Sequence, residues 1–135
     1  MKIQYVSVGI LINNELEILV EKNTTNSIFK GLWQFPGGKV EASEPPLQAL
    51  ERELLEEINV TPLSTTPISF VEYRLENNNK YYTVFFYLVN SWQGEIQAKL
   101  NQELSWVSLD TLRLLPKLPY NKAVVETLYS HIKVK

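Results

Sequence analysis

Carboxylates and glycines gather between Gly37 and Glu57 of this 135-residue chain. If residues 45–58 form a helix, with roughly 100° per residue, Glu53, Glu56 and Glu57 project within an arc of about 100°. Like charges at this spacing repel, and the helix dipole disfavours anions toward the C-terminal end. Mg²⁺, or Mn²⁺ as a substitute, would offset the repulsion, because it prefers carboxylate oxygens and is commonly shared with substrate phosphates. The cluster therefore indicates a cation site for phosphate chemistry, and the alternative is a solvated acidic helix face.

The composition excludes catalytic centres built on cysteine or on several histidines. The chain has no cysteine, which excludes disulfides, thiolate nucleophiles and cysteine zinc sites, and its one histidine, His131, cannot form a histidine metal site alone. Any metal must therefore be held by oxygen atoms. The formal net charge of -2 disfavours a broad basic surface for duplex nucleic acid. We expect a small-molecule partner and no stable nucleic-acid complex.

The elements that position the acidic cluster are predicted from hydrophobic periodicity. A helix is expected from Pro45 to Ile58, with Leu47, Leu50, Leu54 and Ile58 on one apolar face and proline in the first turn. A strand at 33–35 precedes it and ends at the turn Pro36-Gly37-Gly38. The other expected elements are strands at 3–12, 17–20, 68–74, 81–89 and 104–107, turns at 13–14 and 77–79, a loop at 24–30 and a closing helix at 121–132.

These elements predict one α+β domain over residues 1–135, in which helices sandwich a mixed β-sheet. The 44% hydrophobic content is enough for a core without disulfides. The N-terminus lacks the pattern of a signal peptide, and no apolar stretch approaches the ~18 residues needed to span a bilayer. We therefore expect a cytoplasmic protein without membrane association, either a monomer or a homodimer.

The segment from Gly38 to Val60 resembles the sequence box of the Nudix hydrolases, G-x5-E-x7-R-E-U-x-E-E-x-G-U, in which U is aliphatic. The positions that match in register are Gly38, Glu44, Arg52, Glu53, Leu54, Glu56, Glu57 and Val60. The departure is Asn59, where the family has a glycine that ends the helix in a left-handed conformation. Asparagine is the usual substitute at such a position. The resemblance implies the Nudix fold and Mg²⁺-dependent hydrolysis of nucleoside triphosphates.

Carried over to this chain, the resemblance implies that Glu53, Glu56 and Glu57 hold Mg²⁺ together with the backbone carbonyl of Gly37 or Gly38. It also makes Glu53 a candidate for the general base that activates water. The catalytic set expected from the box thus comprises these three glutamates and the pair described next.

Arg52 and Glu44 are expected to form a pair that braces the loop against the helix. The alternative for Glu44 is a first-turn acid favoured by the helix dipole. Lys39 could contact a substrate phosphate, or it could be a solvated loop lysine.

Similarity to MutT-type members of the family extends over nearly the whole chain, through V-G-I-L-I, F-P-G-G-K, W-V-S-L and L-P-Y-N. In those relatives the phenylalanine before P-G-G lines the base pocket, and an asparagine that opens the last helix contacts the purine edge. The corresponding residues are Phe35 and Asn121. Their alternatives are an ordinary core phenylalanine and a helix N-cap.

The resemblance implies a substrate among the oxidised purine nucleoside triphosphates, such as 8-oxo-dGTP. The products would be the nucleoside monophosphate and pyrophosphate. The reaction would remove oxidised nucleotides from the pool used in DNA replication and repair. One alternative is a Nudix hydrolase for another nucleotide, such as CTP or a dCTP derivative. The other is a non-catalytic ligand sensor, which is disfavoured because Glu53, Glu56 and Glu57 are all present.

Three further positions bear on the substrate. Lys80 falls near the place of an arginine that contacts substrate in relatives, although it could be an exposed lysine at a strand edge. Asn23 stands where a MutT-like protein often carries an arginine. Leu100 falls near an additional loop glutamate of the relatives, for which Glu103 is a candidate replacement.

Overall fold

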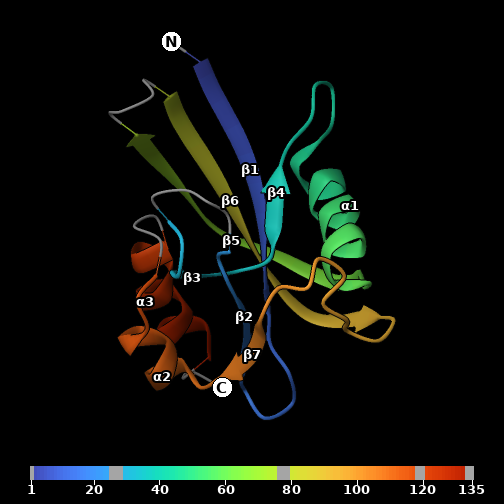
Figure 1. Ribbon diagram of the computed structural model, residues 1–135, viewed down its shortest axis with the longest axis vertical. Coiled ribbons are helices and arrows are strands. Elements are labelled where there is room, and N and C mark those ends of the chain that lie inside the picture. The colour runs from blue at the N-terminus through green and yellow to red at the C-terminus, as the bar shows by residue number, and fades with distance from the viewer. Residues whose placement is uncertain (1, 25–28, 76–79, 118–120, 133–135) are drawn as a thin grey trace.

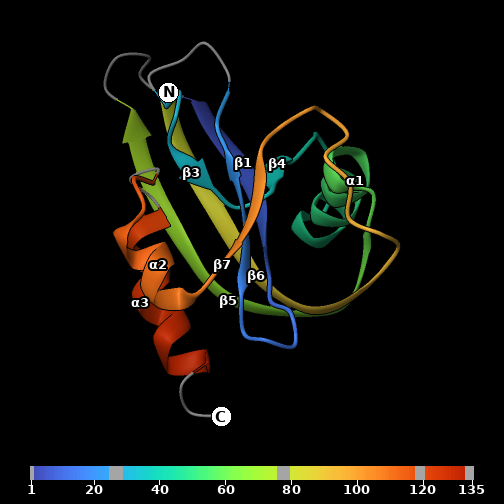
Figure 2. The ribbon, with the colours of Figure 1, turned by 60° about the horizontal axis from the view of Figure 1, so that its bottom comes forward.

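The computed structural model describes residues 2–24, 29–75, 80–117 and 121–132. These residues form two β-sheets with helices on either side. The helices are α1 (Pro46–Ile58), α2 (Leu109–Leu114) and α3 (Asn121–Ile132). Figures 1 and 2 show α1 on one side of the sheets and α2 and α3 on the other. None of the described helices is both long and apolar enough to cross a membrane. The strands are β1 (Lys2–Leu11), β2 (Ile18–Lys22), β3 (Trp33–Gln34), β4 (Gly37–Lys39), β5 (Thr61–Leu75), β6 (Lys80–Gln93) and β7 (Leu104–Val107).

The larger sheet has the strand order β4-β1-β6-β5 and is mixed. Strand β1 pairs in parallel with β6, from Lys2 opposite Lys80 to Leu11 opposite Val89, whereas β4 joins β1 and β5 joins β6 in antiparallel fashion. The smaller sheet, β3-β2-β7, is antiparallel throughout. The mixed sheet with helices on both sides, predicted from the sequence, is confirmed.

Strand β1 contributes to two apolar cores because successive side chains on a strand point to opposite faces. Ile10 belongs to the cluster that includes residues of α2 and α3. Its neighbour Leu11 belongs to the cluster of α1, with Leu50, Leu54 and Ile58. Each fully buried side chain of this size contributes about 1.5–3 kcal/mol. The second core therefore holds α1, and the carboxylates on it, against the sheet.

The ends of α1 follow the sequence expectation closely. Pro45 is extended and precedes the helix, and Pro46 occupies the first turn, where a missing N–H has no effect on the helix. Asn59 ends the helix in the left-handed conformation, with φ 67° and ψ 28°, and its N–H points to the carbonyls of Leu54 and Leu55. Asparagine thus adopts the backbone conformation expected at the position where the Nudix box has glycine.

Several other expectations were wrong in detail. Leu47 is 41% exposed, so it does not belong to the buried face of α1, and Ala49 is buried instead. The glycines after Pro36 form strand β4, because they pair with β1, rather than a turn alone. Strand β5 begins at Thr61, well before the predicted residue 68, because bulges keep it paired with β6.

Helix α2 was not predicted. It begins after Ser108, whose Oγ accepts the N–H of Thr111 at 3.1 Å. The predicted turn at 13–14 is confirmed, because Asn13 Oδ1 accepts the N–H groups of Glu15 and Glu17. The predicted turn at 77–79 lies outside the described residues, as does part of the predicted loop at 24–30.

Candidate active site

The two glycines of β4 allow the backbone to approach both β1 and α1 closely. A side chain at Gly37 would overlap the backbone of Ser7 and Val8, and one at Gly38 would overlap the carboxylate of Glu53. Any other residue at Gly37 would push β4 away from β1, and any other residue at Gly38 would displace the Glu53 carboxylate. The glycine pair thus brings the backbone of the loop into contact with the acidic residues of α1.

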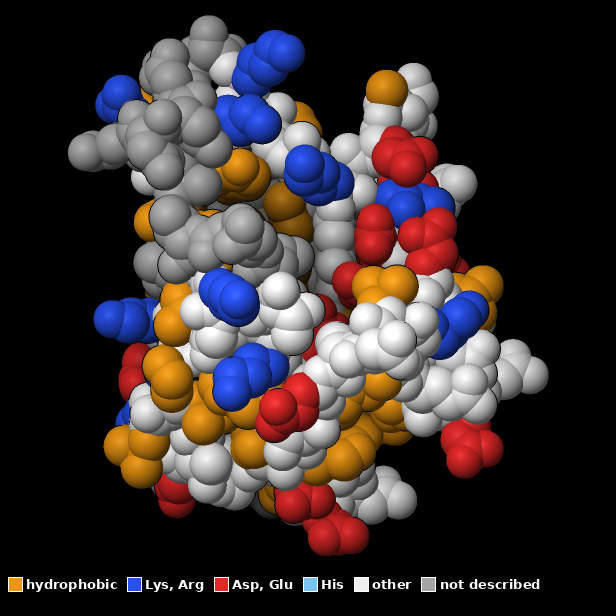
Figure 3. Space-filling view, viewed as in Figure 1, with side chains coloured by type: hydrophobic (Ala, Val, Ile, Leu, Met, Phe, Trp, Pro, Cys, Tyr) orange, Lys and Arg blue, Asp and Glu red, His pale blue; other side chains and the backbone are white. Residues whose placement is uncertain are grey.

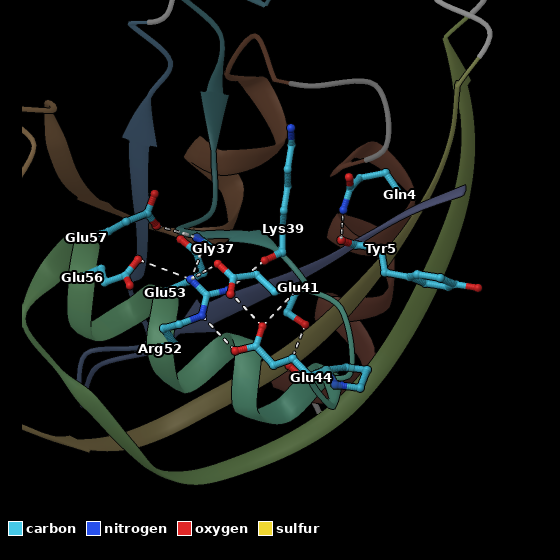
Figure 4. A network of polar contacts seen from close by, with 12 residues as sticks. Gln4, Tyr5, Gly37, Lys39, Glu41, Glu44, Arg52, Glu53, Glu56 and Glu57 are labelled. Carbon is cyan, nitrogen blue, oxygen red and sulfur yellow. Dashed lines mark hydrogen bonds and ion pairs between the residues drawn. The ribbon is translucent and has the colours of Figure 1, made fainter. Parts of the chain in front are cut away.

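Arg52 connects the loop to α1. Its guanidinium donates from Nε to Glu44 Oε2 at 2.8 Å and from Nη2 to Glu44 Oε1 at 3.0 Å, and Nη2 also donates to the Lys39 carbonyl at 2.9 Å (Figure 4). The expected contact between Arg52 and Glu44 is therefore present, and it is bidentate. These hydrogen bonds are the main reason why the pKa of Glu44 is lowered to about 2, with the Glu41 N–H contributing. Glu44 precedes the helix, so the alternative of a first-turn acid is wrong.

Glu53, Glu56 and Glu57 lie along the side of α1 that faces this loop (Figure 4). Arg52 Nη1 donates to Glu53 Oε1 at 3.0 Å and to Glu56 Oε2 at 3.4 Å, and the Gly37 N–H donates to Glu57 Oε2 at 3.0 Å. Burial, followed by the charges of Glu21 and Glu53, raises the pKa of Glu57 to about 8. Burial also raises the pKa of Glu53, against the effect of Arg52. The site therefore carries more negative charge than its surroundings favour.

A cavity of about 130 Å³ lies beside the glycine loop. Asn121, the first residue of α3, is only 2% exposed, and its Oδ1 has no hydrogen-bond partner among the described residues. Because this oxygen accepts no backbone N–H there, the interpretation of Asn121 as a helix N-cap is wrong. Phe35 is buried and packs edge-to-face on Phe86, with ring centroids 6.3 Å apart, so it both lines the cavity and belongs to the core. The lining residues are Val6, Val8, Gln34, Phe35, Gly37, Gly38, Lys39 and Asn121.

The family model described as NUDIX domain matches residues 4–128. The chain belongs to the Nudix family. It is 35% identical over 128 residues to the 8-oxo-dGTP diphosphatase of Escherichia coli K12. The aligned region covers 95% of this chain and 98% of that protein. It is 30% identical over 119 residues to the CTP pyrophosphohydrolase of the same organism, with coverage of 88% and 87%.

A solved structure shows the same likeness. It is a MutT structure from work on Aliivibrio salmonicida and Vibrio cholerae, 30% identical to this chain, with a TM-score of 0.81 and coverage of 97% of this chain and all of that one. The expected Nudix fold and the assignment to the Nudix hydrolases are thus confirmed.

The metal-ligating residues expected from the Nudix box are close together, but their side chains are held by other partners. Among the described residues, no group of three or more acidic or histidine side chains is arranged to hold a metal ion. Arg52 binds Glu53 and Glu56, and the Gly37 N–H binds Glu57. The donor set nevertheless fits a hard divalent cation, because it consists of carboxylate and carbonyl oxygens whose mutual repulsion a cation would relieve.

Figure 3 shows how charge is distributed over this face of the Nudix domain. Acidic side chains gather along α1 around a basic one, while lysine and arginine side chains lie mostly on the opposite half of the view. Lys39 lines the cavity beside the glycine loop, and its ammonium points away from the carboxylates (Figure 4). Lys80 begins β6 opposite Lys2 and is not among the residues that line this cavity.

Two buried residues near the Nudix box were not anticipated. Glu21 of β2 and Gln102 line a second cavity together with Glu57, and Gln102 Nε2 donates to the Glu57 carbonyl at 3.0 Å. Glu103, the candidate for an additional carboxylate, is exposed, and so is Leu100. One feature of the sequence could have indicated Glu21, because this charged residue directly follows the apolar run I-L-V in β2.

Proposed function

We propose that this Nudix hydrolase cleaves oxidised purine nucleoside triphosphates, with 8-oxo-dGTP as its substrate, to the monophosphate and pyrophosphate. The observation that carries the proposal is the buried Asn121 amide, with an open acceptor, in a cavity next to the acidic residues of α1. The relationship to the 8-oxo-dGTP diphosphatase of E. coli over nearly the whole chain supports the same substrate. Cleansing of the nucleotide pool would place the enzyme in the cytoplasm.

The Asn121 side chain matches the edge of an oxidised guanine. An amide carries both hydrogen-bond donors and an acceptor. The 8-oxoguanine base presents a carbonyl at O6 and an N–H at N7, so the amide can donate to the first and accept from the second. Guanine has an acceptor at N7, which an amide oxygen does not bind. Phe35 supplies an apolar surface beside Asn121 in the same cavity, as a base-binding site requires.

The carboxylates of Glu53, Glu56 and Glu57, with the carbonyl of Gly37 or Gly38, would hold Mg²⁺, or Mn²⁺ in its place. When bound, the cation neutralises negative charge on the triphosphate, which is the main requirement of phosphoryl transfer.

Other residues of the chain would orient the reacting groups. Glu53 is the candidate that accepts a proton from the attacking water, and Arg52, fixed by Glu44, holds the Glu53 carboxylate beside the glycine loop. Lys39 and Lys80 are candidates for contacts with substrate phosphates, as point charges.

A pyrimidine nucleoside triphosphate is the second candidate substrate. The observation in its favour is the relationship to the CTP pyrophosphohydrolase of E. coli, which spans most of both chains at slightly lower identity. An asparagine amide can also pair with the amino group and N3 of cytosine, so hydrogen-bonding capacity alone does not exclude this base. The size of the base and the contacts at O6 and N7 distinguish the two candidates.

Incubation with 8-oxo-dGTP and Mg²⁺ tests the proposed reaction, with products separated by chromatography. We expect equal amounts of 8-oxo-dGMP and pyrophosphate, and loss of turnover when a chelator is in excess, because every candidate ligand is a hard oxygen. Release of inorganic phosphate and 8-oxo-dGDP would show attack at a different phosphorus. Full turnover in excess chelator would exclude the cation mechanism.

A further inference from the structure

Glu21 is a buried carboxylate to which the proposed reaction assigns no part. It is 5% exposed and comes from β2, the central strand of the smaller sheet. Its Oε2 accepts the Nε2–H of Gln34 at 2.9 Å, but Oε1 has no hydrogen-bond partner among the described residues. Buried carboxylates are normally paired with a cation or fully hydrogen-bonded, because the interior solvates their charge poorly. The unpartnered oxygen of Glu21 therefore indicates a missing partner.

Neither Lys22 nor Arg52 provides that partner. Lys22, the next residue along β2, has its Nζ 5.8 Å from the ring centroid of Trp33. Arg52 is engaged by the α1 carboxylates, Glu44 and the Lys39 carbonyl. None of the ion pairs within the described residues includes Glu21 or Glu57.

Glu21 and Glu57 line the same cavity of about 120 Å³, together with Gln34 and Gln102. The remaining lining residues are Lys22, Asn23, Thr24 and Leu100. Because a water molecule occupies about 30 Å³ in the liquid, the cavity has room for a cation and some of its bound waters. The two carboxylates reach it from different elements, β2 and α1, and the charge of Glu21 acts on Glu57. The amides of Gln34 and Gln102 fix the surroundings, since one binds Glu21 Oε2 and the other binds the Glu57 carbonyl.

We propose that Glu21 is an additional carboxylate of the cation site, and that it binds a divalent cation together with Glu57. The inference rests on the proposed function, because it extends the same cation site from α1 to β2. Glu21 Oε1 supplies an oxygen without a hydrogen-bond partner among the described residues, and Gln34 keeps the carboxylate oriented through Oε2. The Gln102 amide also lies close enough to favour the charged form of Glu21, as the Gln34 amide does. Alternatively, Glu21 could serve only to link β2 to β3 by accepting the hydrogen bond from Gln34. In that case the affinity of the protein for a divalent cation would not depend on Glu21.

Mn²⁺ binding to the protein without nucleotide, measured by isothermal titration calorimetry, tests the proposal in the variant Glu21→Gln. Glutamine keeps the size of the side chain and an acceptor for Gln34 but removes the charge. We expect Mn²⁺ affinity to fall by about tenfold or more, as for loss of a group that supports a metal site. We also expect the metal-free variant to melt at a higher temperature than the wild type, because a buried charge near Glu57 is gone.

Two further variants complete the experiment. Glu15→Gln removes one charge from the exposed turn before β2, and it should leave both Mn²⁺ affinity and the melting temperature unchanged. Glu21→Asp keeps the charge on a side chain one methylene shorter, so its affinity should lie between those of the wild type and Glu21→Gln.

Wild-type Mn²⁺ affinity in Glu21→Gln, with a lowered melting temperature, would overturn the proposal and leave Glu21 as a structural acceptor. Absence of Mn²⁺ binding by the wild type would overturn it as well. Either result is distinguishable from failure of the proposed function, because hydrolysis of 8-oxo-dGTP is measured separately through its products.

Discussion

Replacing Glu53 or Glu57 with glutamine is expected to lower kcat for nucleoside triphosphate hydrolysis by about 100-fold or more, the scale of a lost acid–base or charge-stabilising group. Glu53 is the candidate general base, and both residues are candidate ligands for the cation. The variants should remain folded, because both residues lie on the side of α1 that faces the loop, and Leu50, Leu54 and Ile58 hold the other side in the core. Removing one charge from a cluster of like charges should keep or raise the melting temperature.

The matched control is Glu51→Gln, which removes the same charge from an exposed position on the same helix. It should retain wild-type kcat in steady-state assays of pyrophosphate release. An unchanged kcat in folded Glu53→Gln or Glu57→Gln would remove that residue from its proposed role. An equal loss in Glu51→Gln would attribute the effect to the charge of the helix as a whole.

Features that depend on nearby residues were predictable from the sequence. The period of apolar residues located α1, and its carboxylate spacing placed Glu53, Glu56 and Glu57 on one side. Asn59 was expected to end the helix in a left-handed conformation because few residue types tolerate that backbone geometry. The pairing of Arg52 with Glu44 was anticipated from the resemblance to the Nudix box, and the contact exists because the loop turns back onto the helix.

Features that depend on pairing between distant segments were not predictable. Strand β4 exists because Gly37 and Gly38 pair with β1, and two glycines have little intrinsic preference for a strand. The burial of Glu21 depends on the position of β2 between β3 and β7 and on the approach of α1. The sequence favours an N-cap role for Asn121 because that is the common role of asparagine at a helix start, and only the unpartnered Oδ1 in the structure excludes the role.

Asn121→Ala is expected to reduce kcat/KM for 8-oxo-dGTP about ten- to a hundredfold more than kcat/KM for dGTP. The physical reason is that an unpaired buried polar group costs about 1–3 kcal/mol, and the alanine variant leaves the N7–H and O6 of the oxidised base without partners. Guanine loses less, because its N7 cannot donate to the asparagine oxygen. The control is Lys122→Ala, the next residue on α3, which is exposed and should leave the ratio of the two rates unchanged.

Parallel measurement of both rate constants and the melting temperature separates recognition from stability. If Asn121→Ala lowers the melting temperature while the ratio of the two rate constants stays constant, Asn121 supports the fold and does not read the base. In that case the cavity beside the glycine loop would lose its role in base selection.

The ratio of kcat/KM among 8-oxo-dGTP, dGTP and CTP in the wild-type enzyme with Mg²⁺ tests the central claim most directly. We expect 8-oxo-dGTP to exceed both other nucleotides by at least about tenfold, since a site that hydrogen-bonds a substrate N–H discriminates against a base that lacks it. A higher kcat/KM for CTP, or equal values for 8-oxo-dGTP and dGTP, would contradict the claim.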